Sequence, residues 1–204
     1  MPRPVALSVP GLTLVEEYLD AEEQQRLLSV VDALPWLEGT GIRRRVQHYG
    51  WRYDYSARSL DASLRLGPLP DWAAELAERI RRDGWKDKPA DQVIVNEYLP
   101  GQGIAAHIDC VPCFDATVVS LSLGSACVMD FSDTATPQTA AVPLPAGSLL
   151  VMTGEARYRW KHGLAKRRRD RHDGQVFERS RRVSLTFRNV VTDFSTPAAR
   201  SSGP

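Results

Sequence analysis

The spacing of hydrophobic positions changes along the chain and predicts helices first and strands afterwards. Asp20 and Glu23 have the pattern of a capping box, so a helix is expected over 24–34. The apolar stripe of this helix consists of Leu27, Leu28 and Val31. A second helix is expected over 71–84, where the apolar residues at helical spacing are Trp72, Leu76 and Ile80.

Short apolar runs bounded by glycine and proline follow the second helix, as around LPGQG and PLPAGS. Their lengths fit β-strands, and the predicted strands cover 92–99, 104–109, 116–123, 126–131, 141–144, 148–152 and 181–190. Many short strands at even spacing are typical of a jelly roll. We therefore expect an α+β fold that is mainly β, a cupin-like jelly roll preceded by N-terminal helices.

One segment, NEYLPGQGIAAHID over 96–109, ends in a His-x-Asp pair. Side chains two residues apart on a strand point the same way, so His107 and Asp109 could both reach one metal ion. With His162 as a third ligand, the set would be two histidines and one carboxylate. This facial triad leaves positions open on non-heme Fe(II) for oxygen and a co-substrate, which suggests oxidation chemistry.

The strand predicted over 181–190 has two different faces. One face carries polar side chains, namely Arg182, Ser184, Thr186 and Arg188, and the other carries Val183, Leu185 and Phe187. Two arginines on the inner face of a β-barrel are costly unless an anion meets them. A dicarboxylate would meet that need, because guanidinium groups pair with carboxylates through two parallel hydrogen bonds.

These motifs stand in an order that resembles the AlkB family of Fe(II)/2-oxoglutarate dioxygenases: Asn-x-Tyr, His-x-Asp, a distant His and an Arg-x-x-x-x-x-Arg strand. The chain looks closest to the branch that contains the animal tRNA wobble-uridine hydroxylase. The resemblance runs from about Gly11 to Asn189 and includes VVSLSLGSACVMDF and SLLVMTGEARYRWKHG. It implies a double-stranded β-helix, with a lid over the substrate nucleotide.

The resemblance also implies roles for individual residues. His107, Asp109 and His162 would hold Fe(II), and Arg182 and Arg188 would hold the two carboxylates of 2-oxoglutarate. Further hydrogen bonds to this co-substrate would come from Asn96, Tyr98 and Ser184, the last standing where many relatives carry asparagine. The implied reaction is oxidative decarboxylation of 2-oxoglutarate by O2, coupled to hydroxylation of a substrate C–H bond.

No structural zinc is expected. The animal branch binds zinc through a histidine shortly after the His-x-Asp pair and through cysteines near the C-terminus. Here the corresponding position is Val111, and the tail VVTDFSTPAARSSGP has no cysteine.

The segment GIRRRVQHYGWRYDYSARS interleaves cations with aromatic residues and is the expected substrate lid, with Arg45, Trp51 and Tyr53 as candidate contacts. An amphipathic hairpin whose aromatic residues merely cover the barrel explains the same pattern equally well. The basic run KRRRDR over 166–171 is expected to be a mobile loop, which would bind phosphate if it lay beside the iron site. His172 lies in this polar loop and is not expected to bind metal.

Composition indicates an ordinary soluble protein. The 204 residues have a hydrophobic share of 43% and a net charge of +1, and they contain no apolar run long enough to span a bilayer. We expect a single domain, with a helical and lid extension over 11–90, a jelly-roll core over 91–190 and a disordered tail over 191–204. The N-terminus lacks a secretory pattern, so a cytoplasmic monomer is expected.

The cysteines are Cys110, Cys113 and Cys127, and the first two form a Cys-x-x-Cys pair. Zinc needs four ligands and the chain has no second pair, while a thioredoxin-like motif opens a helix and this pair precedes a predicted strand. We therefore favour two free thiols that are sensitive to oxidation, and a redox role stays open.

Three functions fit the sequence. The first is a dioxygenase that hydroxylates or dealkylates a nucleobase in tRNA or in single-stranded DNA or RNA, as the lid and the basic run suggest. The second is a dioxygenase of the same fold that acts on a protein or a small molecule, which the near-neutral net charge favours. The third is a non-catalytic cupin-like binding domain, and the complete ligand set argues against it.

Overall fold

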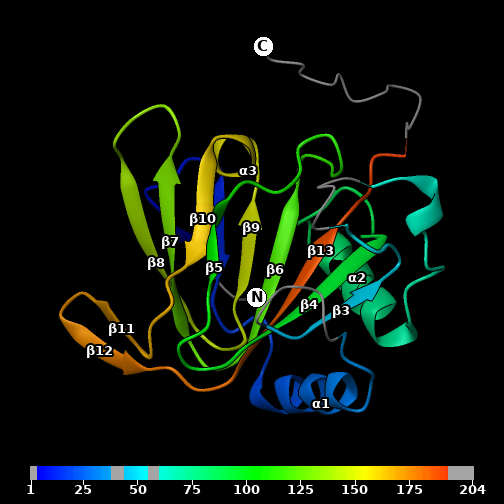
Figure 1. Cartoon of the computed structure of the whole chain (residues 1–204), viewed down its shortest axis with the longest axis horizontal. Coiled ribbons are helices and arrows are strands. Elements are labelled where there is room, and N and C mark those ends of the chain that lie inside the picture. The colour runs from blue at the N-terminus through cyan, green and yellow to red at the C-terminus, as the bar shows by residue number, and fades with distance from the viewer. Residues whose placement is uncertain (1–3, 38–43, 55–59, 193–204) are drawn as a thin grey trace.

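Two packed β-sheets form the frame of the protein in a computed structural model that describes residues 4–37, 44–54 and 60–192 (Figure 1). The larger sheet has the strand order β1 (Pro4–Ala6), β2 (Leu12–Val15), β9 (Leu149–Met152), β6 (Val118–Gly124), β13 (Arg182–Arg188), β4 (Gln92–Tyr98) and β3 (Val46–Tyr49). The smaller has the order β5 (Ile104–His107), β10 (Trp160–Leu164), β7 (Cys127–Asp133) and β8 (Thr139–Leu144). This arrangement is the predicted jelly roll.

Two helices cover the outer face of the larger sheet, and a third, short helix lies before β10 (Figure 1). Helix α1 (Ala21–Asp32) begins with the predicted capping box, in which the Glu23 N–H donates to Asp20 at 2.8 Å. Helix α2 (Asp71–Arg82) has the predicted extent, and α3 covers Gly154–Tyr158. A 3-10 turn, η1, covers Ala62–Leu64.

The alternation of the central strands separates two hydrophobic cores. On β13, Val183, Leu185 and Phe187 are fully buried against the helices, in a core that also holds Leu27 and Ile80. Each such side chain contributes roughly 1.5–3 kcal/mol when it leaves water. The second core lies between the sheets and includes Leu150, Phe131 and Trp160. The predicted division of this strand into an apolar and a polar face is therefore confirmed.

The basic run over 166–171 is not a loop throughout, as the sequence suggested, because its second half belongs to a hairpin of β11 (Arg169–His172) and β12 (Gln175–Glu178). The buried carboxylate of Asp170 explains the difference. It accepts hydrogen bonds from Arg179 Nη2 at 2.7 Å, from Arg167 Nε at 2.6 Å and from the Val128 N–H at 3.0 Å. One of the arginines that were expected to face solvent or phosphate, Arg167, therefore pairs with Asp170, and this carboxylate fixes the hairpin to β7.

Strands β1, β2, β3 and β10 were also not predicted, although β10 carries His162. Strands β2 and β3 come from the 11–90 segment and hydrogen-bond to β9 and β4. The expected disordered tail lies, apart from 191–192, outside the described residues, as do Arg43 and Tyr55 of the expected lid. Within the described residues, no helix is long and apolar enough to cross a membrane.

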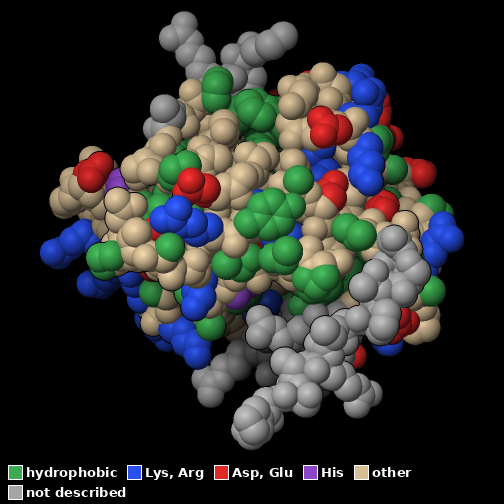
Figure 2. Space-filling view, turned by 90° about the horizontal axis from the view of Figure 1, so that it is seen from above, with side chains coloured by type: hydrophobic (Ala, Val, Ile, Leu, Met, Phe, Trp, Pro, Cys, Tyr) green, Lys and Arg blue, Asp and Glu red, His purple; other side chains and the backbone are tan. Residues whose placement is uncertain are grey.

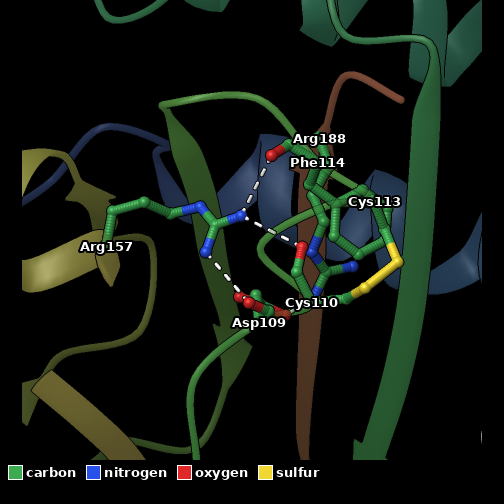
Figure 3. Close-up of a disulfide and its surroundings, with 6 residues drawn as sticks. All are labelled: Asp109, Cys110, Cys113, Phe114, Arg157 and Arg188. Atoms are coloured by element: carbon green, nitrogen blue, oxygen red, sulfur yellow. Dashed lines mark hydrogen bonds and ion pairs between the residues drawn. A yellow bond between two sulfur atoms is a disulfide. The ribbon is translucent and has the colours of Figure 1, made fainter. Parts of the chain in front are cut away.

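Cys110 and Cys113 form a disulfide, so the expectation of two free thiols is wrong (Figure 3). The cause is a tight turn, in which the N–H groups of Cys113 and Phe114 both donate to the Cys110 carbonyl, at 3.2 and 3.3 Å. The turn brings the two Cα atoms to 5.2 Å, within the usual range for a disulfide. Cys127 is a free, buried thiol on β7.

The Asp170 network makes a prediction for stability. Asp170→Asn should lower the free energy of unfolding by about 3–5 kcal/mol, because it leaves the buried Arg179 charge without its carboxylate. Urea denaturation measures this difference. Asp173→Asn is the control, since Asp173 lies in the turn of the same hairpin with a side chain that is 88% exposed. Its effect should stay within about 0.5 kcal/mol. Equal stability of the two variants would contradict the structural role of Asp170.

The disulfide makes a prediction for thiol chemistry. Alkylation of the unreduced protein in denaturant should modify one cysteine, Cys127, and alkylation after reduction should modify all three. Intact mass spectrometry counts the added groups. Three modified cysteines before reduction, in protein purified with its thiols protected from exchange, would show that Cys110 and Cys113 are free.

Candidate functional site

A cavity of about 270 Å³ lies between the two sheets and collects the candidate residues from both of them. All eight side chains proposed to hold metal or co-substrate line it: Asn96, Tyr98, His107, Asp109, His162, Arg182, Ser184 and Arg188. They come from β4, β5, β10 and β13 and from the loop after β5. The antiparallel register explains how residues so distant in sequence meet, since Arg182 pairs with Tyr98 and Ser184 with Asn96.

The two histidines face each other across the β5–β10 pair. His107 and His162 are register partners, and their ring centroids are 4.6 Å apart. Gly163 permits this close approach, because a Cβ there would lie 2.9 Å from the backbone of β5. His107 Nδ1 lies 2.9 Å from the Ala105 carbonyl oxygen, which can only accept, so Nδ1 carries the proton. Its Nε2 lone pair is thereby directed to a metal.

Asp109 reaches the same place by a different route from the one the sequence suggested. Strand β5 ends at His107, so Asp109 lies in the following loop and not on the strand face that it was expected to share. Its Oδ2 is 3.9 Å from His162 Nε2, and its Oδ1 accepts a hydrogen bond from Arg188 at 2.7 Å. Among the described residues, no three His, Cys, Asp or Glu side chains are already close enough together to hold a metal ion, so Asp109 and the two histidines would have to move closer to bind one.

The protonation states of these groups suit a metal. Burial alone would raise the pKa of the Asp109 carboxyl, but the charges of Arg188 and the neighbouring histidines hold that pKa below its ordinary value. Burial lowers the pKa of His162 to about 4. At neutral pH the site therefore offers a carboxylate and a neutral imidazole, the forms that bind divalent metal. Two histidines and one carboxylate fit Fe(II).

Arg182 carries a buried charge that no carboxylate among the described residues neutralises. Its side chain is buried, with the residue only 3% exposed, and its Nη2 donates to Ser122 Oγ at 2.9 Å. Its buried Nε has no hydrogen-bond partner, and among the described residues it forms no ion pair with a carboxylate. An unpaired buried charge is costly. The lining carries Arg44, Arg182 and Arg188 against Asp109, a net charge of +2 with neutral histidines (3 − 1), which a dicarboxylate such as 2-oxoglutarate neutralises.

Arg44 is a cavity residue that the sequence reasoning missed. Its Nε donates to Asn96 Oδ1 at 2.9 Å. The Asn96 amide oxygen is thereby fixed as an acceptor, and the amide N–H groups can donate to another partner. Arg44 and Arg182 both lie against the Tyr98 ring, at 5.7 and 5.6 Å from its centroid. The alternation of β3 was the missing signal. His48 pairs with Ile94, which lines the cavity, and Arg44 lies four residues before His48, so both side chains fall on the same face.

Of the three lid candidates, the structure brings only Tyr53 to the cavity. Arg45 falls on the other face of β3, where Glu97 accepts two hydrogen bonds from it, both at 2.7 Å, and where its guanidinium lies over Trp36. Trp51 is buried in a cluster with Cys113, Phe114 and Val190, against which Tyr53 packs. Arg45 and Trp51 thus do not line the cavity, since one binds a carboxylate and the other packs beside the mouth, and their contacts with substrate stay predictions.

The basic hairpin also lies away from this mouth. The half-buried residues Tyr53, Ile108 and Cys110 mark the mouth, and the loop with the last two is at the top in Figure 1, whereas β11 and β12 are at the lower left. The run 166–171 was expected to bind phosphate only if it lay beside the iron site, and it does not lie there. Seen from above, hydrophobic side chains occupy the middle of the upper face and most Lys and Arg lie toward its margins (Figure 2).

Comparison with known proteins agrees with this geometry. The model of the 2OG-Fe(II) oxygenase superfamily matches residues 11–188. The mouse tRNA (carboxymethyluridine(34)-5-O)-methyltransferase ALKBH8 is 38% identical over 208 residues, covering 89% of this chain but 30% of that protein. The alkylated DNA repair protein ALKBH8 homolog of Arabidopsis thaliana is 37% identical over 208 residues, covering 90% of this chain and 59% of that protein. The chain thus spans less than two thirds of the length of each of these relatives.

Among solved structures, that of OsALKBH1 has the same fold, with a TM-score of 0.67 at 19% identity, covering 92% of this chain and all of that one. The family match spans both sheets apart from β1, both outer helices and every residue that lines the cavity. The chain belongs to the 2OG-Fe(II) oxygenase superfamily and within it to the AlkB family, near the ALKBH8 branch, and the cofactors of this superfamily are Fe(II), 2-oxoglutarate and O2.

Proposed function

We propose that this protein is an Fe(II)- and 2-oxoglutarate-dependent dioxygenase that hydroxylates or oxidatively dealkylates a nucleobase in tRNA or in single-stranded DNA or RNA. The observation that carries the co-substrate assignment is the buried Arg182, which lacks a carboxylate and shares a cavity with two histidines and an aspartate. Bound Fe(II) supplies the coupling of 2-oxoglutarate decarboxylation by O2 to oxidation of a C–H bond.

The residues of the cavity would have two functions, metal binding and co-substrate binding. His107, Asp109 and His162 would hold the metal, and Arg182 and Arg188 would bind the carboxylates of 2-oxoglutarate. Asn96, Tyr98 and Ser184 would donate hydrogen bonds to the same co-substrate from neighbouring strands. Because the cavity lies between the sheets, these groups act away from bulk water, where charge pairing is stronger.

Two observations favour a nucleobase as substrate. The names of the relatives refer to carboxymethyluridine in tRNA and to repair of alkylated DNA. At the mouth, Tyr53 lies with its ring centroid 5.9 Å from that of Phe114, which gives an aromatic pair that a planar base can stack on. Such a base must be unpaired or flipped out of a helix to reach the metal ligands.

The co-substrate assignment is tested with Arg182→Met. Loss of the guanidinium should weaken 2-oxoglutarate binding by about 3–5 kcal/mol, at least roughly a hundredfold, because a buried carboxylate would lose its partner. Isothermal titration calorimetry of the Mn(II)-loaded protein measures this affinity. The apo variant should be no less stable than the wild type, since the substitution removes an uncompensated charge.

Arg181→Met is the matched control for this experiment. Arg181 precedes Arg182 but pairs with Glu97 at 2.7 Å and with Asp32, on the side of the sheet away from the cavity. Its 2-oxoglutarate affinity should equal that of the wild type. Wild-type affinity in Arg182→Met would refute the assignment.

The substrate class is tested by turnover. Unmodified and alkylated tRNA or single-stranded oligonucleotides should stimulate succinate formation, and mass spectrometry of the digested nucleosides should detect the hydroxylated or dealkylated base. His107→Ala should abolish both signals, and Tyr53→Ala should reduce the stimulation while leaving turnover without nucleic acid intact. Stimulation by a peptide or small metabolite, but by no nucleic acid, would instead support the second function.

A further inference from the structure

Arg157 is a buried arginine that the ligand assignments leave unused. It belongs to α3 and is 2% exposed. Its guanidinium points into the loop that joins β5 to β6, the loop that carries Asp109 and the disulfide (Figure 3). Among the described residues it has no carboxylate within ion-pair distance, so its charge must be satisfied in another way.

Four backbone carbonyls of this one loop satisfy it. Arg157 Nη1 donates to the Asp109 carbonyl at 3.0 Å, and Nε donates to the Asp115 carbonyl at 3.1 Å. Nη2 donates to the carbonyls of Cys110 and Phe114 at 3.2 and 3.1 Å. The planar fork of an arginine has donors in fixed directions, so these bonds define the path of the loop in a way that a single donor could not.

The bond to Asp109 is the one that bears on the metal site. Strand β5 ends at His107, so no sheet hydrogen bond of the kind that fixes His107 and His162 fixes the backbone of Asp109. Arg157 binds the carbonyl of that residue directly. It also lies five residues before His162 (162 − 157), in the helix that leads into β10. One side chain therefore ties the segment with the carboxylate ligand to the segment with the second histidine.

We propose that Arg157 is a positioning residue that sets the place of the Asp109 carboxylate relative to His107 and His162, and thereby the affinity of the site for divalent metal. This inference rests on the proposed function, because it takes these three residues as the metal ligands. Supporting groups of this kind typically change metal affinity by about 10–100-fold when they are removed.

The test uses Arg157→Lys and Arg157→Met with the matched control Arg159→Met. Arg159 lies two residues on, pairs with Asp133 at 2.6 Å and with Glu155, and has no hydrogen bond to the loop of Asp109. Mn(II) affinity is measured by calorimetry without 2-oxoglutarate or nucleic acid, and the visible spectrum of the Co(II) protein reports the ligand geometry. Thermal unfolding of each apo variant is recorded in parallel.

We expect Mn(II) binding roughly 10–100-fold weaker in Arg157→Met, an intermediate loss in Arg157→Lys and wild-type binding in Arg159→Met. The Co(II) spectrum should change in the Arg157 variants alone. If Arg157→Met does not fold, Arg157→Lys decides, since its ammonium keeps a donor for the loop. Wild-type Mn(II) affinity and an unchanged spectrum in folded Arg157→Lys, even with a lower melting temperature, would overturn the inference and leave a structural role.

The same titrations separate this inference from the proposed function. If the wild type binds Mn(II) and His107→Ala does not, the metal site stands whatever the Arg157 variants show. If the wild type binds no Mn(II), or His107→Ala binds it equally well, the proposed metal site fails and this inference fails with it.

Discussion

Burial of the Arg182 charge is the constraint on which the site depends. Among the described residues the guanidinium donates to a serine hydroxyl and lies against the Tyr98 ring, and an internal carboxylate would have removed the need for a ligand. Because no such carboxylate is present among the described residues, the buried charge raises the free energy of the cavity until an anion enters. If Arg182 binds 2-oxoglutarate as we propose, stability that the apo protein lacks becomes affinity for this co-substrate. The sheet permits this because Val183 and Leu185, on the opposite face of β13, pack against the helices.

The two kinds of proposed metal ligand are held by different means. His107 and His162 are register partners in a ladder of backbone hydrogen bonds, so their separation follows from the geometry of a β-sheet. Asp109 stands past the end of that ladder, and its backbone takes its place from a side chain on another segment. The Asp109 carboxylate is also bound by Arg188, which donates to its Oδ1 at 2.7 Å. The proposed ligand that lies outside the sheet is thus the one that contacts an arginine proposed to bind the co-substrate.

What the sequence predicted well was governed by a local period, although the period failed for Asp109, which lies past the end of β5. The polar and apolar faces of β13 and the capping box of α1 follow from spacing alone, and the cavity lining follows from the motifs and their resemblance to a family. What it predicted poorly depends on contacts made after folding. Arg45 was preferred to Arg44 because a run of three arginines does not state which of them faces inward, and the partner that decides this, Glu97, lies far away in sequence. Asp170 in its basic hairpin and Arg157 in its short helix escaped for the same reason, since their partners are distant or are backbone atoms.

The loop between β5 and β6 connects the chemistry to the choice of substrate. Near its start it carries Asp109, a proposed metal ligand, and it continues through the disulfide to Phe114, which packs in one cluster with Trp51 and Tyr53. A substrate that stacks on Tyr53 therefore acts on the same short, cross-linked segment that positions the carboxylate at the metal. Backbone carbonyls of both ends of this segment accept hydrogen bonds from Arg157, so a displacement of the loop at the mouth would strain the same guanidinium that binds the Asp109 backbone. This shared contact couples the mouth to the proposed metal site.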